Sequence, residues 1–221
     1  MKDIIKIYSE KNLDLKPHDI IKVKNIDEII RSVKDCRWIE ETLKKAPFVV
    51  VRRGEFIEGE VPIGIRGKTR DERYGTYLKK ENVLEVIPPE DISEKKLWLT
   101  NNHIRISEIF NALKITDSVL KEKKFKWGPT GSTAFELVSG VETINKNSDL
   151  DILIKVPNFL SVNEAKEINE KLQKVPCKID IQLEVPSGII SLVEYERGDN
   201  PILLRTNEGY SLVKNPWEDN K

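Results

Sequence analysis

Cysteine and histidine are scarce in this chain, which limits the sites that it can build. The two cysteines, Cys36 and Cys177, lie far apart and form no CxxC or CxxH pair. We therefore expect neither a zinc site nor a disulfide framework, and we interpret both as free thiols in a reducing, cytoplasmic compartment. With only two histidines in the chain, the dipeptide His18-Asp19 lacks the further histidines that an HD phosphohydrolase uses around its metals.

A net charge and a long apolar run are missing as well. The 37 basic and 37 acidic side chains cancel, so no overall field attracts a nucleic acid polymer or an anionic membrane. No apolar stretch is long enough to span a bilayer, and charges interrupt the first residues, unlike those of a secretory signal peptide. We expect no nucleic acid or membrane partner, and any phosphate recognition must come from a local cluster of residues.

At 221 residues, the chain is long enough for one large domain or two small ones. The charged segment 88–96 separates two parts of different character and is the best candidate for a boundary. We expect a small N-terminal α+β domain over residues 1–92 and a second domain over 97–221. In the first, apolar spacing predicts a helix over 26–44, followed by strands in the segments PFVVVRRG and VPIGIRG.

The second part alternates strands with helices. Apolar spacing predicts helices over 107–121 and 163–174, and another that begins at Thr133. Strands are predicted in FKWGPTGS, which runs into a Gly-Pro turn, and over 148–156 and 178–185. This order makes an α/β or α+β core, and we expect the α+β class.

Three carboxylates fall on the two later strands of this core. Asp149 and Asp151 alternate with apolar residues, so a strand places both on one face, with Cα atoms about 6.6 Å apart. Asp180 alternates in the same way on the next strand and joins them if the two strands are neighbours. Three crowded carboxylates repel by several kcal/mol, which a divalent cation relieves. We therefore expect a magnesium site, since magnesium takes carboxylate oxygens and completes its shell with substrate phosphates.

A glycine-bearing turn precedes these strands and leads into the helix that begins near Thr133. Backbone N–H groups at a helix start form an anion site, and Gly131 allows the backbone to approach a phosphate closely. Ser132 is expected to cap the helix and to donate its hydroxyl to a phosphate oxygen. Each piece alone has a simpler explanation, as a chance Asp-x-Asp, a helix cap or a solvated strand face. The ordered set of strand, turn, helix and two acidic strands favours the nucleotide site.

Basic residues supply further candidates for phosphate binding. A triphosphate or an acidic carrier protein is a reasonable partner for a cluster in the N-terminal part, although the cluster is equally well explained as a solvated face interleaved with Asp71 and Glu72. Its members are Arg66, Lys68, Arg70 and Arg73. Arg205 precedes a turn at Gly209 and is a further candidate that could reach the site from the C-terminal strand.

The Gly-Ser turn, the Asp-x-Asp pair and the later carboxylate resemble the pattern of the DNA polymerase β-like nucleotidyltransferase superfamily. This resemblance implies a nucleotidyltransferase domain with a mixed sheet. Between Ser132 and Asp149 the chain is slightly longer than in the minimal members, and we expect a loop over 139–148 there.

Nearly the whole chain resembles a narrower family, the malonate decarboxylase holo-acyl-carrier-protein synthases or phosphoribosyl-dephospho-CoA transferases. The segments that carry the resemblance are PHD, FVVVRR, PIGIRGKTRDER, TGSTAFELVSG, SDLDILI, KIDIQLE and LLRTNEGYSLVKNPW. The resemblance implies transfer of a prosthetic group from 2'-(5''-triphosphoribosyl)-3'-dephospho-CoA to a serine of the decarboxylase acyl carrier protein, with release of pyrophosphate.

In that reaction two magnesium ions bridged by Asp149 and Asp151 would neutralise the attacking and departing oxygens. Asp180 would ligate one of them or accept the serine proton, while Gly131 and Ser132 would hold the leaving phosphates. Two alternatives remain open from the sequence. One is a nucleotidyltransferase with a different acceptor, and the other is a nucleotide-binding regulatory module without catalysis.

Overall fold

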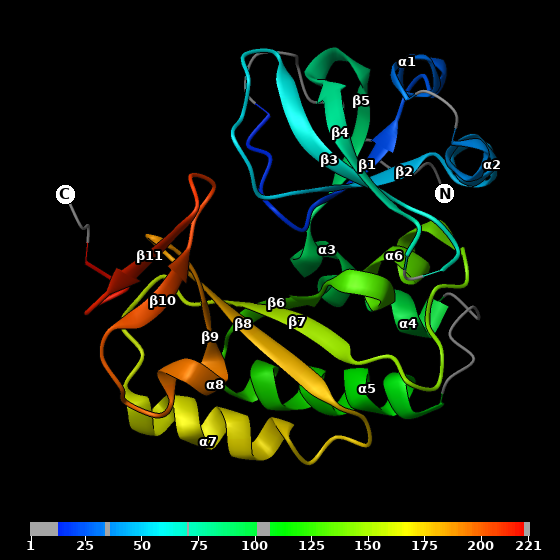
Figure 1. Ribbon diagram of the computed structural model, residues 1–221. Coiled ribbons are helices and arrows are strands. Elements are labelled where there is room, and N and C mark those ends of the chain that lie inside the picture. Colours follow the sequence, from blue (N-terminus) through cyan, green and yellow to red (C-terminus); the bar gives the residue numbers. More distant parts are fainter. Residues whose placement is uncertain (1–12, 34–35, 70, 101–106, 219–221) are drawn as a thin grey trace.

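The computed structural model describes residues 13–33, 36–69, 71–100 and 107–218. These residues form two β-sheets, one from each half of the chain, with helices packed against both (Figure 1). The expected α+β class is confirmed. Among the described residues, no helix combines the length and the apolar character that a membrane span needs.

The first sheet is entirely antiparallel, in the order β4-β3-β2-β1-β5. Its strands are β1 (Ile20–Val23), β2 (Phe48–Val51), β3 (Glu60–Arg66), β4 (Arg73–Lys79) and β5 (Val83–Ile87). The 3-10 turn η1 (Lys80–Asn82) lies between β4 and β5. The segments predicted as strands from PFVVVRRG and VPIGIRG are β2 and β3.

The single helix expected over residues 26–44 is wrong, because two helices stand in its place. They are α1 (Asp27–Ser32) and α2 (Arg37–Lys45), and Val33 after α1 has an extended backbone. Val33 and Ile39 are both buried in the core of this half. Six positions of an unbroken helix turn by about 240°, so one straight helix could not bury both side chains against the same sheet.

The second sheet is mixed, as the resemblance to the nucleotidyltransferase superfamily implied, in the order β11-β10-β9-β8-β7-β6. Only β7 and β8 are parallel, and α7 (Val162–Leu172) connects them; every other described neighbouring pair is antiparallel. The strands are β6 (Lys126–Pro129), β7 (Leu150–Lys155), β8 (Ile179–Val185), β9 (Gly188–Ser191), β10 (Ile202–Arg205) and β11 (Tyr210–Val213).

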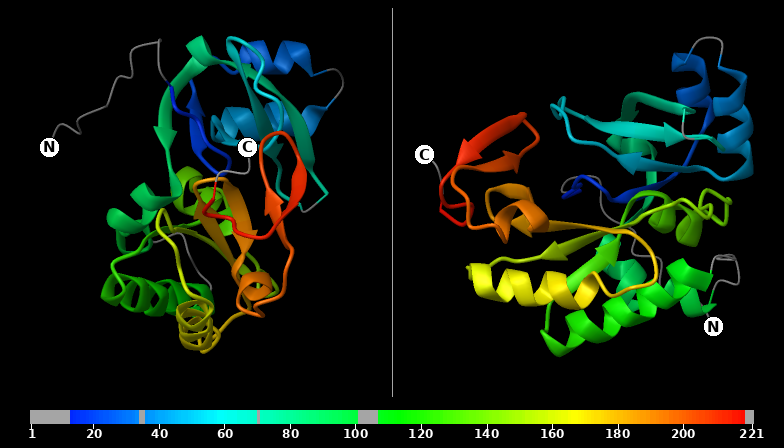
Figure 2. Two further views of the ribbon diagram at one scale, coloured as in Figure 1. Left: turned by 90° about the vertical axis from the view of Figure 1, so that its left-hand side faces the viewer. Right: turned by 60° about the horizontal axis from the view of Figure 1, so that its bottom comes forward.

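The helices α5 (Ser107–Glu122) and α7 lie side by side beneath one face of this sheet (Figure 2). The other face carries α6 (Gly131–Ser139) and looks toward the first sheet. The short α8 (Leu192–Tyr195) follows β9. Helix α7 starts at a capping box in which Ser161 and Glu164 each bond the other's backbone N–H, an arrangement that satisfies two otherwise unpaired donors.

The segment between the two sheets is helical. It forms α3 (Pro89–Glu94) and α4 (Leu97–Thr100), and Trp98 packs on Trp127 of β6 with ring centroids 5.9 Å apart. A Cβ added to Gly128 of β6 would lie 1.8 Å from the Pro89 carbonyl oxygen, so the glycine permits this close approach. The expected division at residues 92 and 97 falls within this segment and stays a prediction.

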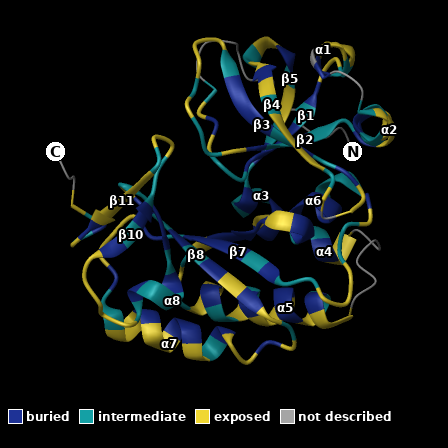
Figure 3. Ribbon diagram, in the orientation of Figure 1, coloured by how far each residue is buried: buried dark blue, intermediate teal, exposed yellow. Residues whose placement is uncertain are grey.

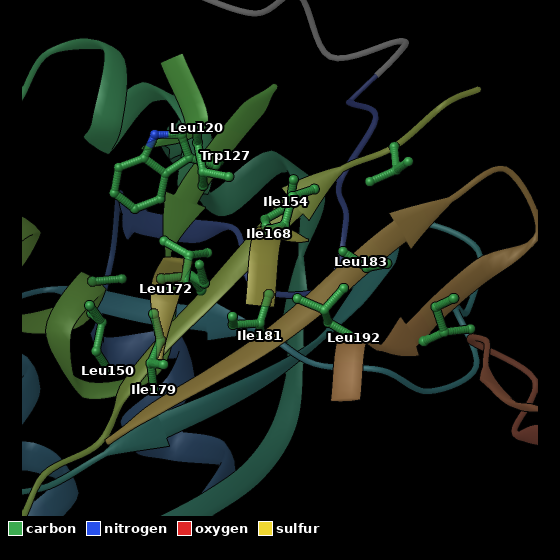
Figure 4. Close-up of a cluster of buried hydrophobic side chains, with 14 of the residues drawn as sticks. Leu120, Trp127, Leu150, Ile154, Ile168, Leu172, Ile179, Ile181, Leu183 and Leu192 are labelled. Atoms are coloured by element: carbon green, nitrogen blue, oxygen red, sulfur yellow. The ribbon is translucent and has the colours of Figure 1, made fainter. Parts of the chain in front are cut away.

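The larger hydrophobic core lies between the second sheet and helices α5 and α7. Alternate strand residues such as Leu150, Ile152 and Ile154 point into it and are almost fully buried (Figure 4 labels several members of the cluster). Each such side chain contributes about 1.5–3 kcal/mol. Because period two commits these residues to one face, Asp151 is placed on the other. Figure 3 shows exposed residues on the outer surfaces of α5 and α7.

Candidate active site

Two of the three predicted carboxylates are direct neighbours across parallel strands. Asp151 on β7 pairs in register with Asp180 on β8, so both side chains leave the same face of the sheet, and adjacent strands lie about 4.8 Å apart. Asp151 is half-buried and Asp180 is exposed. Asp149 immediately precedes β7, and its Oδ2 accepts a hydrogen bond of 2.8 Å from Lys178 Nζ.

The surroundings of Asp151 disfavour the ionised form of its carboxyl. Burial raises the pKa of its carboxyl first, and the negative charges of Asp180 and then Asp149 raise it further. The positive charges of Arg66 and Arg73 act in the opposite direction. Asp151 therefore sits between acidic neighbours on its own sheet and basic residues from the other half of the chain, where a bound cation would favour its ionised form.

The three carboxylates alone do not make a complete set of magnesium ligands. Within the described ranges, no group of three or more His, Cys, Asp or Glu side chains lies close enough to hold a metal ion. Magnesium is commonly bound through one or two carboxylates and completes its shell with water and substrate phosphates. The donors Asp149 and Asp151, which line one hollow, fit that mode, and the role of all three carboxylates as metal ligands stays a prediction.

The Gly-Ser turn lies directly against Asp151. The Thr130 N–H donates to the Asp151 carbonyl oxygen at 2.8 Å, which ties the end of β6 to β7. Gly131 has a φ of 60°, and a Cβ at this position would lie 2.1 Å from Asp151 Oδ2. Glycine is therefore required by both the backbone conformation and the space, and the start of α6 is held beside the carboxylate.

The expected role of Ser132 as a helix cap is wrong. The N-cap of α6 is Thr130, whose side chain makes no capping bond, and Ser132 is the second residue inside the helix. The first turn thus keeps backbone N–H groups that no side chain caps, which is the feature that makes a helix start attract anions. Ser132 and Gly131 both line the hollow that contains Asp151.

Glu136, which the sequence analysis did not single out, shapes the other wall of this hollow. Its buried Oε2 accepts hydrogen bonds of 2.7 Å from the N–H groups of Thr143 and Ile144. The Thr143 hydroxyl in turn donates to the Ser132 carbonyl oxygen at 3.0 Å. The loop expected over 139–148 is thereby folded back over the start of α6. A glutamate inside the apolar run TAFELV was the signal for this role.

The hairpin of β3 and β4 supplies the basic side of the hollow. Arg66 and Arg73 are paired in register where the two strands meet their connecting loop, and both line the hollow with Lys68 and Thr69. Its volume is about 710 Å³. The Thr69 N–H donates to Glu72 Oε2 at 2.9 Å, which closes the loop between the two strands. Arg70 lies outside the described residues.

Arg205 is the candidate that the structure places elsewhere. It lies on β10 and lines a second hollow together with Arg53 and Lys16, at the other end of β8 from Asp180. Among the predicted residues within the described ranges, all but Arg205 and Asp180 line the hollow of Asp151, and Asp180 lies beside Asp151 in register. The function of each as a catalytic or binding residue stays a prediction.

Comparison with known proteins gives matches over both halves of the chain. The family description "Phosphoribosyl-dephospho-CoA transferase MdcG N-terminal domain" matches residues 16–89, and the corresponding C-terminal domain matches residues 97–216. No solved structure matches the chain.

Three curated relatives are named phosphoribosyl-dephospho-CoA transferase. The protein of Pseudomonas syringae pathovar tomato is 34% identical over 181 residues, which cover 82% of this chain and 84% of the relative. The protein of Azotobacter vinelandii is 29% identical, with 95% and 98% covered. The protein of Klebsiella pneumoniae is 29% identical, with 91% and 96% covered.

Proposed function

Because this chain belongs to the phosphoribosyl-dephospho-CoA transferase family and is a transferase, we propose that it modifies the acyl carrier protein of malonate decarboxylase. The donor is 2'-(5''-triphosphoribosyl)-3'-dephospho-CoA. The phosphoribosyl-dephospho-CoA group passes to a serine of the carrier protein, and pyrophosphate is released.

The reaction is a displacement at the α-phosphorus of the triphosphate. The serine oxygen forms a bond to this phosphorus while the bond to the oxygen that bridges the α- and β-phosphorus breaks. The electron pair of the broken bond leaves with pyrophosphate. The serine proton passes to the carboxylate of Asp180, which is exposed and pairs in register with Asp151, when that carboxylate is not a metal ligand, and otherwise to solvent.

One observation carries this proposal. The Asp151 carboxylate is enclosed between the start of α6, which crowds it at Gly131, and the hairpin that brings Arg66 and Arg73. Uncapped N–H groups and guanidinium groups bind phosphate oxygens, while a carboxylate repels them unless a cation stands between. A hollow that contains both phosphate-binding groups and carboxylates therefore suits a triphosphate bound to a metal ion.

Each residue of the hollow then has a distinct task. Gly131 and Ser132 bind the departing phosphates through the helix start, and Arg66, Arg70 and Arg73 orient the triphosphate from the opposite side. Asp149 and Asp151, with Asp180, would hold magnesium. Two ions bound there would neutralise charge on the attacking and departing oxygens.

The test is pyrophosphate release and mass gain on the carrier protein. Native protein, magnesium, the donor and the carrier protein are expected to give stoichiometric pyrophosphate and a carrier protein modified at one serine. Chelation of magnesium should stop both. The variant Asp151→Asn should lower the rate about 1,000-fold or more, because several kcal/mol of charge stabilisation disappears.

The matched control is Asp199→Asn, which removes an exposed carboxylate remote from the hollow and should leave the rate unchanged. Equal rates for Asp151→Asn and the native protein would overturn the assignment of the site. Release of pyrophosphate without modification of the carrier protein would instead point to a different acceptor. Binding of the donor without any turnover would point to a regulatory module.

A further inference from the structure

The second hollow, at the far end of β8, contains two arginines that the reaction above does not use. It has a volume of about 350 Å³ and is lined by Arg53 after β2, Arg205 on β10 and Lys16 before β1. Thr206 and Asn207 from the turn between β10 and β11 also line it. Figure 1 shows this hairpin at the opposite end of the sheet from α6.

Neither arginine has a carboxylate partner among the described residues. Arg53 Nε and Arg205 Nη1 are buried atoms without a hydrogen-bond partner in the described part of the chain. Glu184 also lines this hollow, but its carboxylate is bound to Lys16 Nζ at 2.9 Å and lies 3.9 Å from Lys155 Nζ. Burial, and then the charge of Arg205, lower the pKa of Arg53. Two like charges removed from water are costly, and an anion between them relieves the cost.

Arg53 is held in place before any ligand arrives. Its Nη2 donates to Gln182 Oε1 at 3.0 Å and lies 3.3 Å from His18 Nε2. Burial, and then the Arg53 charge, lower the pKa of His18 to about 4, so the imidazole is neutral near pH 7 and can accept from the guanidinium. A guanidinium fixed by neutral acceptors keeps its full charge for a ligand, and its side-chain entropy is already lost before binding.

A close approach between the neighbouring strands β9 and β10 places Arg205 at the same hollow. It pairs with Ile189 of β9 and with Tyr210 of β11. A Cβ at Gly188 would lie 2.7 Å from the Arg205 carbonyl oxygen, so glycine is needed for this approach. The turn that follows is closed by the Thr206 N–H, which donates to the Gly209 carbonyl oxygen at 2.8 Å.

The two hollows open on the same face of the second sheet, because Asp151 pairs in register with Asp180 of β8 and Glu184, on the Asp180 side of β8, lines the second hollow. Asp180, Gln182 and Glu184 alternate with buried residues of β8, and four residues of a strand span about 13 Å. The donor carries two phosphate groups, the triphosphate and the diphosphate of dephospho-CoA, which are separated by two linked ribose rings. We propose that Arg53 and Arg205 bind the diphosphate of the dephospho-CoA half, an inference that rests on the proposed function.

Dephospho-CoA is the probe for this site, because it has the diphosphate but lacks the triphosphoribosyl group. Titration calorimetry on the full chain should show that Arg205→Gln or Arg53→Gln weakens dephospho-CoA binding about tenfold or more, as loss of a charged hydrogen-bond partner does. Arg205→Lys, which keeps the charge, should retain part of the affinity. Arg197→Gln, at an exposed arginine outside the hollow, should change the affinity less than twofold.

Asp151→Asn separates this inference from the proposed function, since it should abolish transfer and leave dephospho-CoA binding intact. Unchanged dephospho-CoA affinity in both arginine variants would overturn the diphosphate site, even if native transfer proceeds. Loss of affinity for the carrier protein alone in the arginine variants would overturn it as well, because the hollow would then be a protein contact. Absence of dephospho-CoA binding by the native chain also overturns it, and the transfer assay then decides the proposed function independently. Thermal unfolding near the native temperature shows that each variant is folded.

Discussion

Gly131 is the residue at which the site is most crowded. Its φ of 60° and the 2.1 Å that would separate a Cβ from Asp151 Oδ2 are two separate reasons why a side chain does not fit. A methyl group there must displace either the carboxylate or the start of α6. The position therefore links backbone conformation to the chemistry of the hollow.

We predict that Gly131→Ala lowers transfer about 100-fold or more and the free energy of unfolding by about 1–3 kcal/mol. Gly59→Ala is the matched control, because Gly59 has a φ of 76° but nothing within 4 Å of an added Cβ. It should show the backbone penalty alone and no loss of transfer. Equal effects of the two variants on transfer would contradict the crowding argument.

The raised pKa of Asp151 makes both transfer activity and folding stability depend on pH. Because the pKa of metal-free Asp151 lies above the ordinary value, protons compete with magnesium for this carboxylate at a higher pH than they do at an ordinary aspartate. Transfer should therefore decline on the acidic side while the fold is intact. The same shift means that ionised Asp151 destabilises the fold, an effect that is absent below the unfolded pKa and develops as pH rises through the folded pKa.

We predict that Asp151→Asn raises the thermal midpoint of the metal-free protein at pH 7 and leaves it nearly unchanged near pH 3, where the native carboxyl is already protonated. Scanning calorimetry at the two pH values measures this. A lower midpoint at pH 7 would show that the carboxylate is stabilised by its surroundings. Asp199→Asn should shift neither value.

At the scale of elements, α6 and the loop after it act as one unit. The buried carboxylate of Glu136 holds the N–H groups of Thr143 and Ile144, and the loop lines the hollow with Asn145, Asn147 and Ser148. No local rule of helix or turn places these residues, since the bonds join positions seven and eight apart along the chain.

We predict that Glu136→Ala lowers the free energy of unfolding by about 2–4 kcal/mol, because two half-buried N–H donors lose their carboxylate acceptor. It should also raise KM for the donor more than it lowers kcat, since the loop lines the hollow and does not carry the carboxylates. Glu170→Ala, an exposed glutamate on α7, is the control and should change neither quantity. A fall in kcat at constant KM would contradict the role given to the loop.

The sequence predicted the site better than the arrangement around it. Asp149 and Asp151 could be placed on one face because period two is a local rule, and the turn at Gly131 has a local signature. Asp180 could be added only on the condition that its strand neighbours theirs. β4 was not predicted, since most of its side chains are exposed and show no apolar alternation. The position of Arg205 in the fold depends on the order of the six strands in the second sheet, which no local sequence pattern encodes.

At the scale of the molecule, the two halves share a core. Ile20 and Ile87 of the first sheet and Ile92 of α3 are buried in the same cluster as the strands of the second sheet. Polar contacts add to this, with Arg53 bonded to Gln182 and Lys155 to Glu90. The hollow of Asp151 is lined from both halves, so its shape depends on this shared packing.

We predict that the chain unfolds in a single cooperative transition, although two family domains match it. Scanning calorimetry should give equal calorimetric and van't Hoff enthalpies. Two separated transitions, or a first-sheet fragment that melts as in the full chain, would contradict the shared core. A conservative truncation such as Ile87→Val should lower one common midpoint and not split it.

The parallel pairing of β7 with β8 has a consequence for how the length of the chain can vary. Asp151 and Asp180 meet because both strands keep their register across a connection of loops and α7. A residue gained or lost in the loop after α7 is absorbed there, as loops absorb such changes. The same change inside β8 would rotate every later side chain to the opposite face, exchanging isoleucines for carboxylates. Insertions and deletions among homologues should therefore concentrate in the connections and avoid the two acidic strands.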